Sequence, residues 1–447
     1  MMKMKIKTFF TISLTLALLT RSHAQTLDKA KLDQFFDRLA EKKQAMGSLN
    51  MPKDGQVVYT RAIGYAQVDA TTKKPLTAAS RFRIASITKT FTAVMILQLV
   101  EEGKLKLTDT LDKFFPQVPN ARKITIVQIL AHRSGIPNVR RDQATWKPGE
   151  PVTRDEMLAL IVKGTPEFEP DTKNSYSNSG DFLLGLILEK LTGKTYAGAL
   201  EERINSRIGL KDTYMATGRI DVNKGEALTY DNTGGDWEHW KQGFETHPSI
   251  GMQLISTPGD MAKFIQSLFD LKLISQDSLN QMKTIRDGEG LGLVTFTYGG
   301  KTFYGNTGGG DNYGSWLMYQ PEEKLVVAYA TNAKVYPVKD LISGVIDIYY
   351  GKPFEIPAFA TIAASPEVLD KYIGVYSSPD APRKWTVKRD GGTLLVQPGN
   401  EQAAALEATA QDKFQLFGGR VVFEFDTAKN QLTLKRGGQS MVFTKEK

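Results

Sequence analysis

The sequence predicts an α/β domain of the α+β type, in which helices flank an antiparallel sheet beside an all-α lobe, followed by a small all-β, barrel-like domain. Three observations lead to this prediction. Helical patterns lie at both ends of the first domain, antiparallel strand patterns lie next to them, and a mostly helical stretch lies between. The remaining tail consists of short alternating runs separated by glycine pairs.

The N-terminal residues have the pattern of a signal peptide. Three lysines among the first seven residues precede an apolar run at residues 8–20, and Ser, His and Ala follow at 22–24. We therefore expect residues 1–24 to be removed on export, so that the mature protein begins near Gln25 in the periplasm or outside the cell. The apolar run has 13 residues, too few to span a bilayer. We expect no membrane span after cleavage, and a retained anchor is the alternative.

Composition and charge exclude several classes of function. The chain has no cysteine, which excludes disulfides, thiol nucleophiles and thiolate metal sites. Its formal net charge is +8, and loss of three lysines and Arg21 with the leader leaves about +4, which is too mild to indicate nucleic-acid binding. Only His132, His239 and His247 then remain, without metal-ligand spacing. No catalytic zinc and no cofactor are therefore expected.

The first domain, at residues 25–352, is expected to begin with an amphipathic helix from residue 28 to about 45. A helix at residues 86–100 is apolar almost all round, so it should be buried, and Gly103 is placed to end it. The other expected elements are helices at residues 181–191, 258–271 and 338–349, and strands at 56–59, 62–68, 302–304, 314–319 and 325–331.

Long polar or aromatic stretches at residues 138–174 and 218–248 are typical of functional loops. Trp237 and Trp240 either wall a substrate cleft or pack within the second stretch. A linker is expected at residues 353–365, where the composition shifts to Pro, Ala and Thr, and an all-β domain at 366–447. Strands of that domain are expected to include residues 385–387, 394–396, 421–425 and 432–434.

Ser86 and Lys89 are the first candidate catalytic pair. A serine acts as a nucleophile only if a neighbouring group takes its proton, and a spacing of three residues puts both side chains on one turn of a helix. Lys89 lies in an otherwise apolar helix, where an unpaired ammonium would be costly. The alternative is that Ser86 only caps the helix and Lys89 is solvated.

Tyr176 and Asn178 are the second candidate pair, in a polar segment before a buried helix. A tyrosine beside an ammonium is easier to ionise, which suits it to move a proton between nucleophile and leaving group. Asn178 can donate to a substrate carbonyl and accept from Lys89. A simple polar turn is the alternative.

The third candidate element is the glycine-rich segment at residues 304–310, between two predicted strands. Glycine at a strand edge lets a substrate approach closely, and the N–H of Gly309 can serve as an oxyanion donor. A glycine-rich hairpin without function is the alternative.

In this order, these elements resemble the serine β-lactamase and penicillin-binding protein family, particularly its class C-like branch. The resemblance covers roughly residues 32–350 and rests on RIASITKTFT at 83–92, ILAHRSGIP at 129–137, YSN at 176–178 and STPGDMAKF at 256–264. It implies a β-lactamase/transpeptidase-like fold, acylation of Ser86, Lys89 and Tyr176 as acid and base, and an oxyanion hole from the N–H groups of Ser86 and Gly309. It also implies substrate binding by Asn178, Asn306, Thr307 and Gly308. The tail resembles small β domains appended to such hydrolases.

Asn306 departs from the family pattern, which has Lys or His before Thr-Gly. A neutral amide binds a substrate carboxylate less strongly than a cation does, so the sequence favours a neutral or weakly charged ester or peptide over a β-lactam. His132 is expected to brace a turn.

Three functions stay open at this point. The first is an exported serine hydrolase that cleaves a D-alanyl peptide of the peptidoglycan type, an ester or a β-lactam. The second is a penicillin-binding sensor that is acylated without efficient turnover. The third is a binding module that uses the β tail.

Overall fold

A computed structural model describes residues 27–141, 152–216, 218–232, 236–240, 253–310, 312–359, 365–401, 403–416, 421–436 and 439–446. The expected signal peptide at residues 1–24 lies outside these ranges, as do His247 and parts of both expected long loops and of the expected linker.

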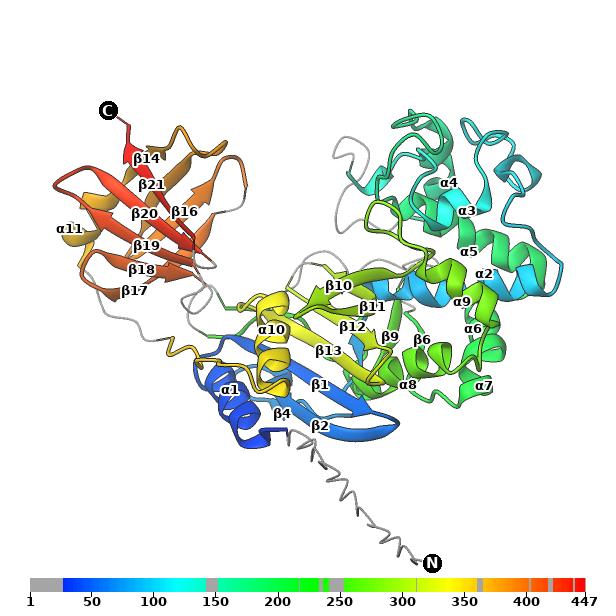
Figure 1. Cartoon of the computed structure of the whole chain (residues 1–447), viewed down its shortest axis with the longest axis horizontal. Coiled ribbons are helices and arrows are strands. Elements are labelled where there is room, and N and C mark those ends of the chain that lie inside the picture. The colour runs from blue at the N-terminus through cyan, green and yellow to red at the C-terminus, as the bar shows by residue number, and fades with distance from the viewer. Residues whose placement is uncertain are drawn as a thin grey trace, which may run out of the picture.

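A six-stranded antiparallel sheet forms the centre of the first domain, in the order β10-β11-β12-β13-β1-β2 (Figure 1). Strand β1 comes from the start of the domain and pairs with β13 from its end, so the sheet forms only when distant segments meet. Its strands are β1 (Ala45–Lys53), β2 (Gln56–Ile63), β10 (Val294–Tyr298), β11 (Lys301–Gly309), β12 (Gly314–Gln320) and β13 (Leu325–Lys334).

Helices cover both faces of this sheet. Helices α1 (Lys29–Glu41) and α10 (Val338–Tyr349) share one buried apolar cluster with Val327 and Tyr329 of β13. The alternate residues Val326 and Ala328 belong instead to the cluster that contains helix α8 (Pro258–Phe269). Because successive side chains of a strand point to opposite faces, β13 is buried on both sides and reads as a continuous apolar run.

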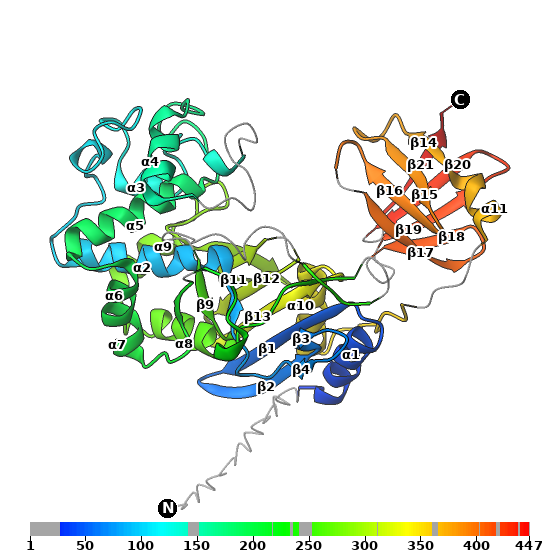
Figure 2. The same cartoon turned by 180° about the vertical axis from the view of Figure 1, so that it is seen from behind.

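The all-α lobe lies beside the sheet, on the side of β10 and β11 (Figures 1 and 2). Its central helices α2 (Thr88–Glu101) and α5 (Asn178–Thr192) pack against each other. Phe91 of α2 stacks on Phe264 of α8, with ring centroids 3.6 Å apart, which joins the lobe to the sheet domain. The other helices of this region are α3 (Ile126–Leu130), α4 (Arg154–Lys163), α6 (Tyr196–Leu200), α7 (Ser206–Ile208) and α9 (Gln276–Lys283).

The C-terminal domain is a closed barrel of eight antiparallel strands, β14 to β21 (Figure 2). Its interior is filled by an apolar cluster that includes Tyr372, Phe414 and Phe425. The elements are α11 (Pro366–Leu369), β14 (Gly374–Ser377), β15 (Trp385–Asp390), β16 (Thr393–Pro398), β17 (Ala404–Ala410), β18 (Lys413–Leu416), β19 (Val421–Asp426), β20 (Gln431–Arg436) and β21 (Gln439–Lys445).

The predicted fold class is confirmed, with an antiparallel sheet flanked by helices, an all-α lobe and a β barrel, but several elements differ from the prediction. The first helix ends at Glu41, not near residue 45, and the central strand β1 was not predicted. Nearly every residue of β1 is buried, so it lacks the alternation that marks a half-exposed strand. Strand β1 also contains Gly47, and a side chain there would clash with Tyr329, because a Cβ would lie 2.5 Å from its hydroxyl. Helix α4 lies within the long loop expected at residues 138–174.

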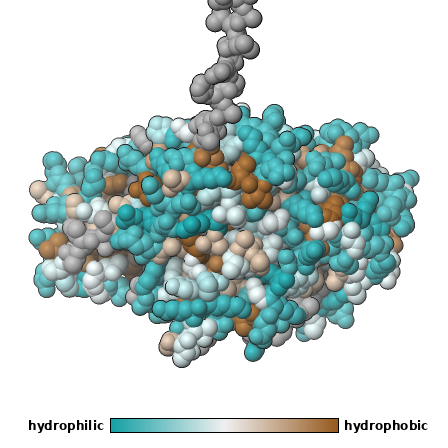
Figure 3. Space-filling model, turned by 90° about the horizontal axis from the view of Figure 1, so that it is seen from below, coloured by the Kyte–Doolittle hydropathy of each residue, from teal (hydrophilic) through white to brown (hydrophobic). Residues whose placement is uncertain are grey.

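The face of the molecule drawn in Figure 3 is largely hydrophilic, and its hydrophobic residues lie in small separate groups. Across the described ranges, no helix combines the length and apolarity that a bilayer crossing requires.

Candidate active site

Ser86 lies where the chain passes from the sheet domain into the buried helix α2. It is the middle residue of the 3-10 turn η1 (Ala85–Ile87), directly before α2. The preceding Ala85 has a φ of +44°, a strained value for a residue with a side chain. The hydroxyl of Ser315 on β12 donates to the carbonyl of Ile84 at 2.8 Å, which ties this turn to the sheet. The serine is therefore held on a rigid, strained turn.

Lys89 is buried one helical turn after Ser86, with 5% of its surface exposed. Its Nζ donates to the Oδ1 of Asn178 at 3.0 Å and to the Oγ of Ser86 at 3.4 Å. The carboxylate of Asp181 lies 3.7 Å away. A buried ammonium needs a counter-charge and acceptors, and α5 supplies both from residues one turn apart.

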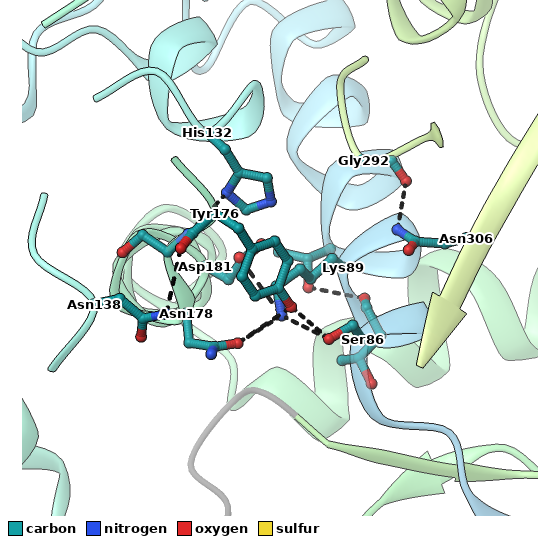
Figure 4. A network of polar contacts seen from close by, with 12 residues as sticks. Ser86, Lys89, His132, Asn138, Tyr176, Asn178, Asp181, Gly292 and Asn306 are labelled. Carbon is teal, nitrogen blue, oxygen red and sulfur yellow. Dashed lines mark hydrogen bonds and ion pairs between the residues drawn. The ribbon is translucent and has the colours of Figure 1, made fainter. Parts of the chain in front are cut away.

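Tyr176 completes the group, and its hydroxyl lies 2.5 Å from the Oγ of Ser86 (Figure 4). The same hydroxyl is 3.3 Å from the Oδ1 of Asn178, and the Nζ of Lys89 lies 4.9 Å from the centroid of the tyrosine ring. Thus Ser86 and Lys89, from one segment, and Tyr176 and Asn178, from another, make one connected polar network.

His132 packs against Tyr176 and binds the backbone on both sides of it. Its ring centroid lies 4.6 Å from that of Tyr176, its Nδ1 accepts from the N–H of Ser177, and its carbonyl accepts from the N–H of Ser175. Burial is the main cause that lowers the pKa of His132. His132 therefore braces the segment that carries Tyr176, as the sequence predicted.

Most of the glycine-rich segment, residues 304–309, is the second half of strand β11, and Gly310 begins the tight connection to the antiparallel strand β12. A Cβ on Gly308 would lie 2.3 Å from the carbonyl oxygen of Ile84, so the absence of a side chain lets β11 run against the Ser86 turn. Gly309 pairs with Gly314 of β12 at the end of the strand. The edge of β11 thus lies beside the nucleophile.

Asn306 on β11 uses part of its amide within the protein. Its Nδ2 lies 3.3 Å from the carbonyl of Gly292 and 3.4 Å from the Oγ1 of Thr90, as the right side of Figure 4 shows for Gly292. Its Oδ1 accepts from the N–H of Thr307. The side chain still faces the cavity described next, but as a neutral group.

A cavity of about 420 Å³ opens between these segments. Of the predicted site residues, it is lined by Ser86, Lys89, Tyr176, Asn306, Thr307, Gly308 and Gly309. Asn178 does not line the cavity. Its Oδ1 instead accepts hydrogen bonds from Lys89 and Tyr176, which do. Of the two alternatives for Trp237, the structure supports packing, because that residue lies against the apolar core and does not line this cavity.

Sequence reasoning missed two carboxyl groups on the cavity wall, those of Asp181 and Glu289. Asp181 had a signal, because it lies one turn after Asn178 in an apolar helix, where a buried acid needs a partner. Glu289 lies in the connection between α9 and β10, where the sequence has no distinguishing pattern. Burial first, then the Asp181 charge, raises the pKa of Glu289 to about 7, against the opposing effect of Lys89.

No group of three or more His, Cys, Asp or Glu residues in the described part of the chain is arranged to hold a metal ion.

A model of the protein family described as Beta-lactamase matches residues 32–346, which include every site residue above. The chain belongs to the Beta-lactamase family. This assignment confirms the resemblance on which the sequence interpretation rested, and it makes the protein a serine hydrolase of the β-lactamase and carboxypeptidase type.

Among curated relatives of this Beta-lactamase family member, penicillin-binding protein 4* of Bacillus subtilis is 26% identical over 89% of each chain. The D-alanyl-D-alanine-carboxypeptidase/endopeptidase AmpH of Escherichia coli is 26% identical over 79% of this chain and all of the relative.

Two solved structures extend the comparison. The octameric penicillin-binding protein homologue of Pyrococcus abyssi superposes with a TM-score of 0.66 and 26% identity over 94% of this chain and 100% of that one. The D-amino acid amidase of Ochrobactrum anthropi has a TM-score of 0.61 and 26% identity over 72% of this chain and 99% of that one.

Proposed function

We propose that this protein is an exported hydrolase that forms an acyl-enzyme on Ser86 and cleaves an amide or ester bond of a small molecule or a D-alanyl-type peptide. The observation that carries this proposal is the meeting of a hydroxyl, an ammonium and a phenol at one cavity, with Ser86 Oγ within 3.4 Å of Lys89 Nζ and 2.5 Å of Tyr176 Oη. The curated and solved relatives, which include a carboxypeptidase and an amidase, support the same reaction type.

In the first half of the reaction, the Oγ of Ser86 attacks the substrate carbonyl as Tyr176, acting as a phenolate beside the Lys89 ammonium, takes its proton. The N–H groups of Ser86 and Gly309 stabilise the oxyanion. The bond from the carbonyl carbon to the leaving group then breaks, and the proton passes through Tyr176 to the leaving nitrogen or oxygen.

Water completes the cycle. It gives a proton to the Tyr176 oxygen, which has passed its own proton to the leaving group, and attacks the acyl-serine. Tyr176 then returns the proton to the Oγ of Ser86, which releases the acid and restores the serine hydroxyl. Asn178 positions Lys89 and Tyr176 through its carbonyl oxygen.

Export is the part of the proposal that rests on the leader pattern of the first 24 residues. N-terminal sequencing of the protein recovered from the periplasm or medium should start near Gln25, and a chain retained intact in the cell would contradict it.

The chemical proposal is tested by intact mass after mixing the purified protein with a fluorescent penicillin and, separately, with p-nitrophenyl acetate. A transient adduct on Ser86 with product release supports the hydrolase. A permanent penicillin adduct without ester turnover supports a penicillin-binding sensor instead. No adduct and no turnover with either reagent overturns acylation of Ser86.

A further inference from the structure

The charges on the wall of the active-site cavity are unusual for a site that would hold an anion. Among the described residues that line it, Lys89 is the only lysine or arginine, while Asp181 and Glu289 are acidic. The Lys89 ammonium is already engaged by Asp181, Asn178 and Ser86. His132 carries no compensating charge at neutral pH, because burial lowers its pKa. Among the described lining residues, no unpaired cation is therefore left to bind a substrate carboxylate.

Glu289 stands between this cavity and a second one of about 340 Å³, which is also lined by Arg133, Asp171 and Arg286. The two arginines do not neutralise Glu289. Arg133 pairs with Asp171 and Asp287, and Arg286 pairs with Asp171.

Within the described residues, the carboxyl of Glu289 has no ion-pair or hydrogen-bonding partner of its own, and the residue is partly buried. The charges that act on it come from Asp181 and Lys89, both in the same cavity. Partial burial removes some of the hydration that stabilises the carboxylate, and a cationic group of a ligand would compensate for that loss.

We propose that Glu289 is a specificity-determining residue that binds a cationic nitrogen of the substrate, so that the cavity takes cationic or neutral substrates and disfavours anionic ones. This inference rests on the proposed acyl transfer at Ser86 and adds the charge of the substrate to it.

The neutral side chains on the cavity wall are consistent with a preference for cationic or neutral substrates. Asn306 and Thr307, on the strand that faces the nucleophile, are neutral, and the Asn306 amide is partly used by Gly292. Because Asp181 and Lys89 balance each other, a substrate carboxylate in this cavity would be repelled by the charge of Glu289, whereas an ammonium group would be attracted by it. The cationic nitrogen can belong to the acyl part or to the leaving group, and the substrates below separate the two.

Two matched substrate pairs test the proposal with the purified full chain. For the leaving group, N-acetylphenylalanine choline ester is compared with its neutral 3,3-dimethylbutyl ester, and for the acyl part, D-phenylalanine amide is compared with its N-acetyl derivative. We expect a higher kcat/KM for the cationic member of at least one pair. In the variant Glu289→Gln that preference should fall about fivefold, the size of a partly exposed ion pair.

Asp287→Asn is the matched control, because this substitution removes the same charge two residues away in the same connection. Asp287 pairs with Arg133 and does not line the cavity. It should keep the preference. A preference that falls equally in both variants reports a general field effect and overturns the specific role of Glu289.

The wild type provides a second readout that needs no variant. The choline group is cationic at every pH. The ratio of kcat/KM for the choline ester to kcat/KM for its neutral analogue should therefore change with the charge of Glu289. With the pKa of Glu289 raised to about 7, the choline preference should rise between pH 6 and pH 8. A preference that is flat across this range would overturn the inference.

The outcomes separate the two proposals. A wild type that hydrolyses none of the four substrates and forms no adduct on Ser86 removes the proposed function, and the inference with it. A wild type that forms the adduct and hydrolyses these substrates without charge preference overturns only the inference.

Discussion

The ammonium of Lys89 lies 3.7 Å from the carboxylate of Asp181, which stands on α5 one turn after Asn178. Both groups are nearly excluded from solvent, with side-chain exposures of 5% and 11%. This pair places a balanced charge directly behind the nucleophile, and it connects the stability of the α lobe to the chemistry of the site.

Replacing Asp181 with Asn should therefore affect stability and activity together. The substitution leaves a buried ammonium without its counter-charge, at a cost of about 3 kcal/mol. We expect a lower thermal midpoint by calorimetry and slower turnover of p-nitrophenyl acetate. An unchanged midpoint would show that the other contacts of Lys89 are sufficient.

Ser86→Ala should abolish acylation and ester hydrolysis while the thermal midpoint stays near that of the wild type, because only a hydroxyl is removed. Tyr176→Phe should retain the fold and lose roughly 100-fold in kcat, the usual contribution of a positioned acid or base. The activity of both variants is measured by turnover of p-nitrophenyl acetate, and their acylation by intact mass after incubation with penicillin. Wild-type turnover in Ser86→Ala would remove that residue from the mechanism.

Gly308→Ala and Gly309→Ala form a matched pair on β11. A Cβ at Gly308 would meet the carbonyl oxygen of Ile84 at 2.3 Å, whereas at Gly309 the nearest atom is 3.9 Å away. Gly308→Ala should push the strand away from the Ser86 turn and destabilise the protein by about 1–3 kcal/mol, with a larger loss of activity than Gly309→Ala. Equal losses would mean that the clash is relieved without displacement of the turn.

Glu289→Gln should change the pH dependence of stability. Burial raises the pKa of Glu289 from 4.5 to about 7, so between these values the folded chain binds more protons than the unfolded chain, and stability falls as the pH rises. The neutral variant lacks this loss. Its midpoint should match the wild type near pH 4 and exceed it at pH 8 by about 2 °C, a modest value because the carboxyl is partly exposed.

A constant difference between the two proteins at pH 4 and pH 8 would contradict that titration. Differential scanning calorimetry in buffers of equal ionic strength is the measurement, because it separates this effect from salt screening.

Asn306→His should improve turnover of carboxylate-bearing β-lactams relative to neutral esters. Asn306 lines the cavity as a neutral group, and a partly protonated imidazole would add a cation to a wall on which the only described lysine or arginine, Lys89, is already paired with Asp181. We expect about a tenfold change in the ratio of the two kcat/KM values at pH 6, which a charge-assisted hydrogen bond can supply. An unchanged ratio would show that this position does not set carboxylate selectivity.

Much of the fold could be predicted from the sequence wherever local periodicity and burial agree. Helix α10 has the bounds expected for it, and the buried helix α2 follows from its apolar composition and from Gly103, whose φ of +71° suits the residue after a helix. Strand β1 could not be predicted, because a central strand buried on both faces has no alternating pattern to distinguish it.

The same division holds for the site. The sequence by itself determined that Ser86 and Lys89 share one helical turn and that Tyr176 and Asn178 lie directly before the buried helix predicted from Asp181, because these relationships depend on spacing alone. Only the tertiary structure decided that the two groups meet, since this requires α2 and α5 to pack side by side.

Glu289 shows where sequence reasoning stops. Its connection has no periodicity, and its carboxyl gains a role only because the connection folds over the cavity next to Asp181 and Lys89. Charge, burial and the effect of neighbours on a pKa are properties of positions in space, and the sequence specifies them only through the complete packing of the chain.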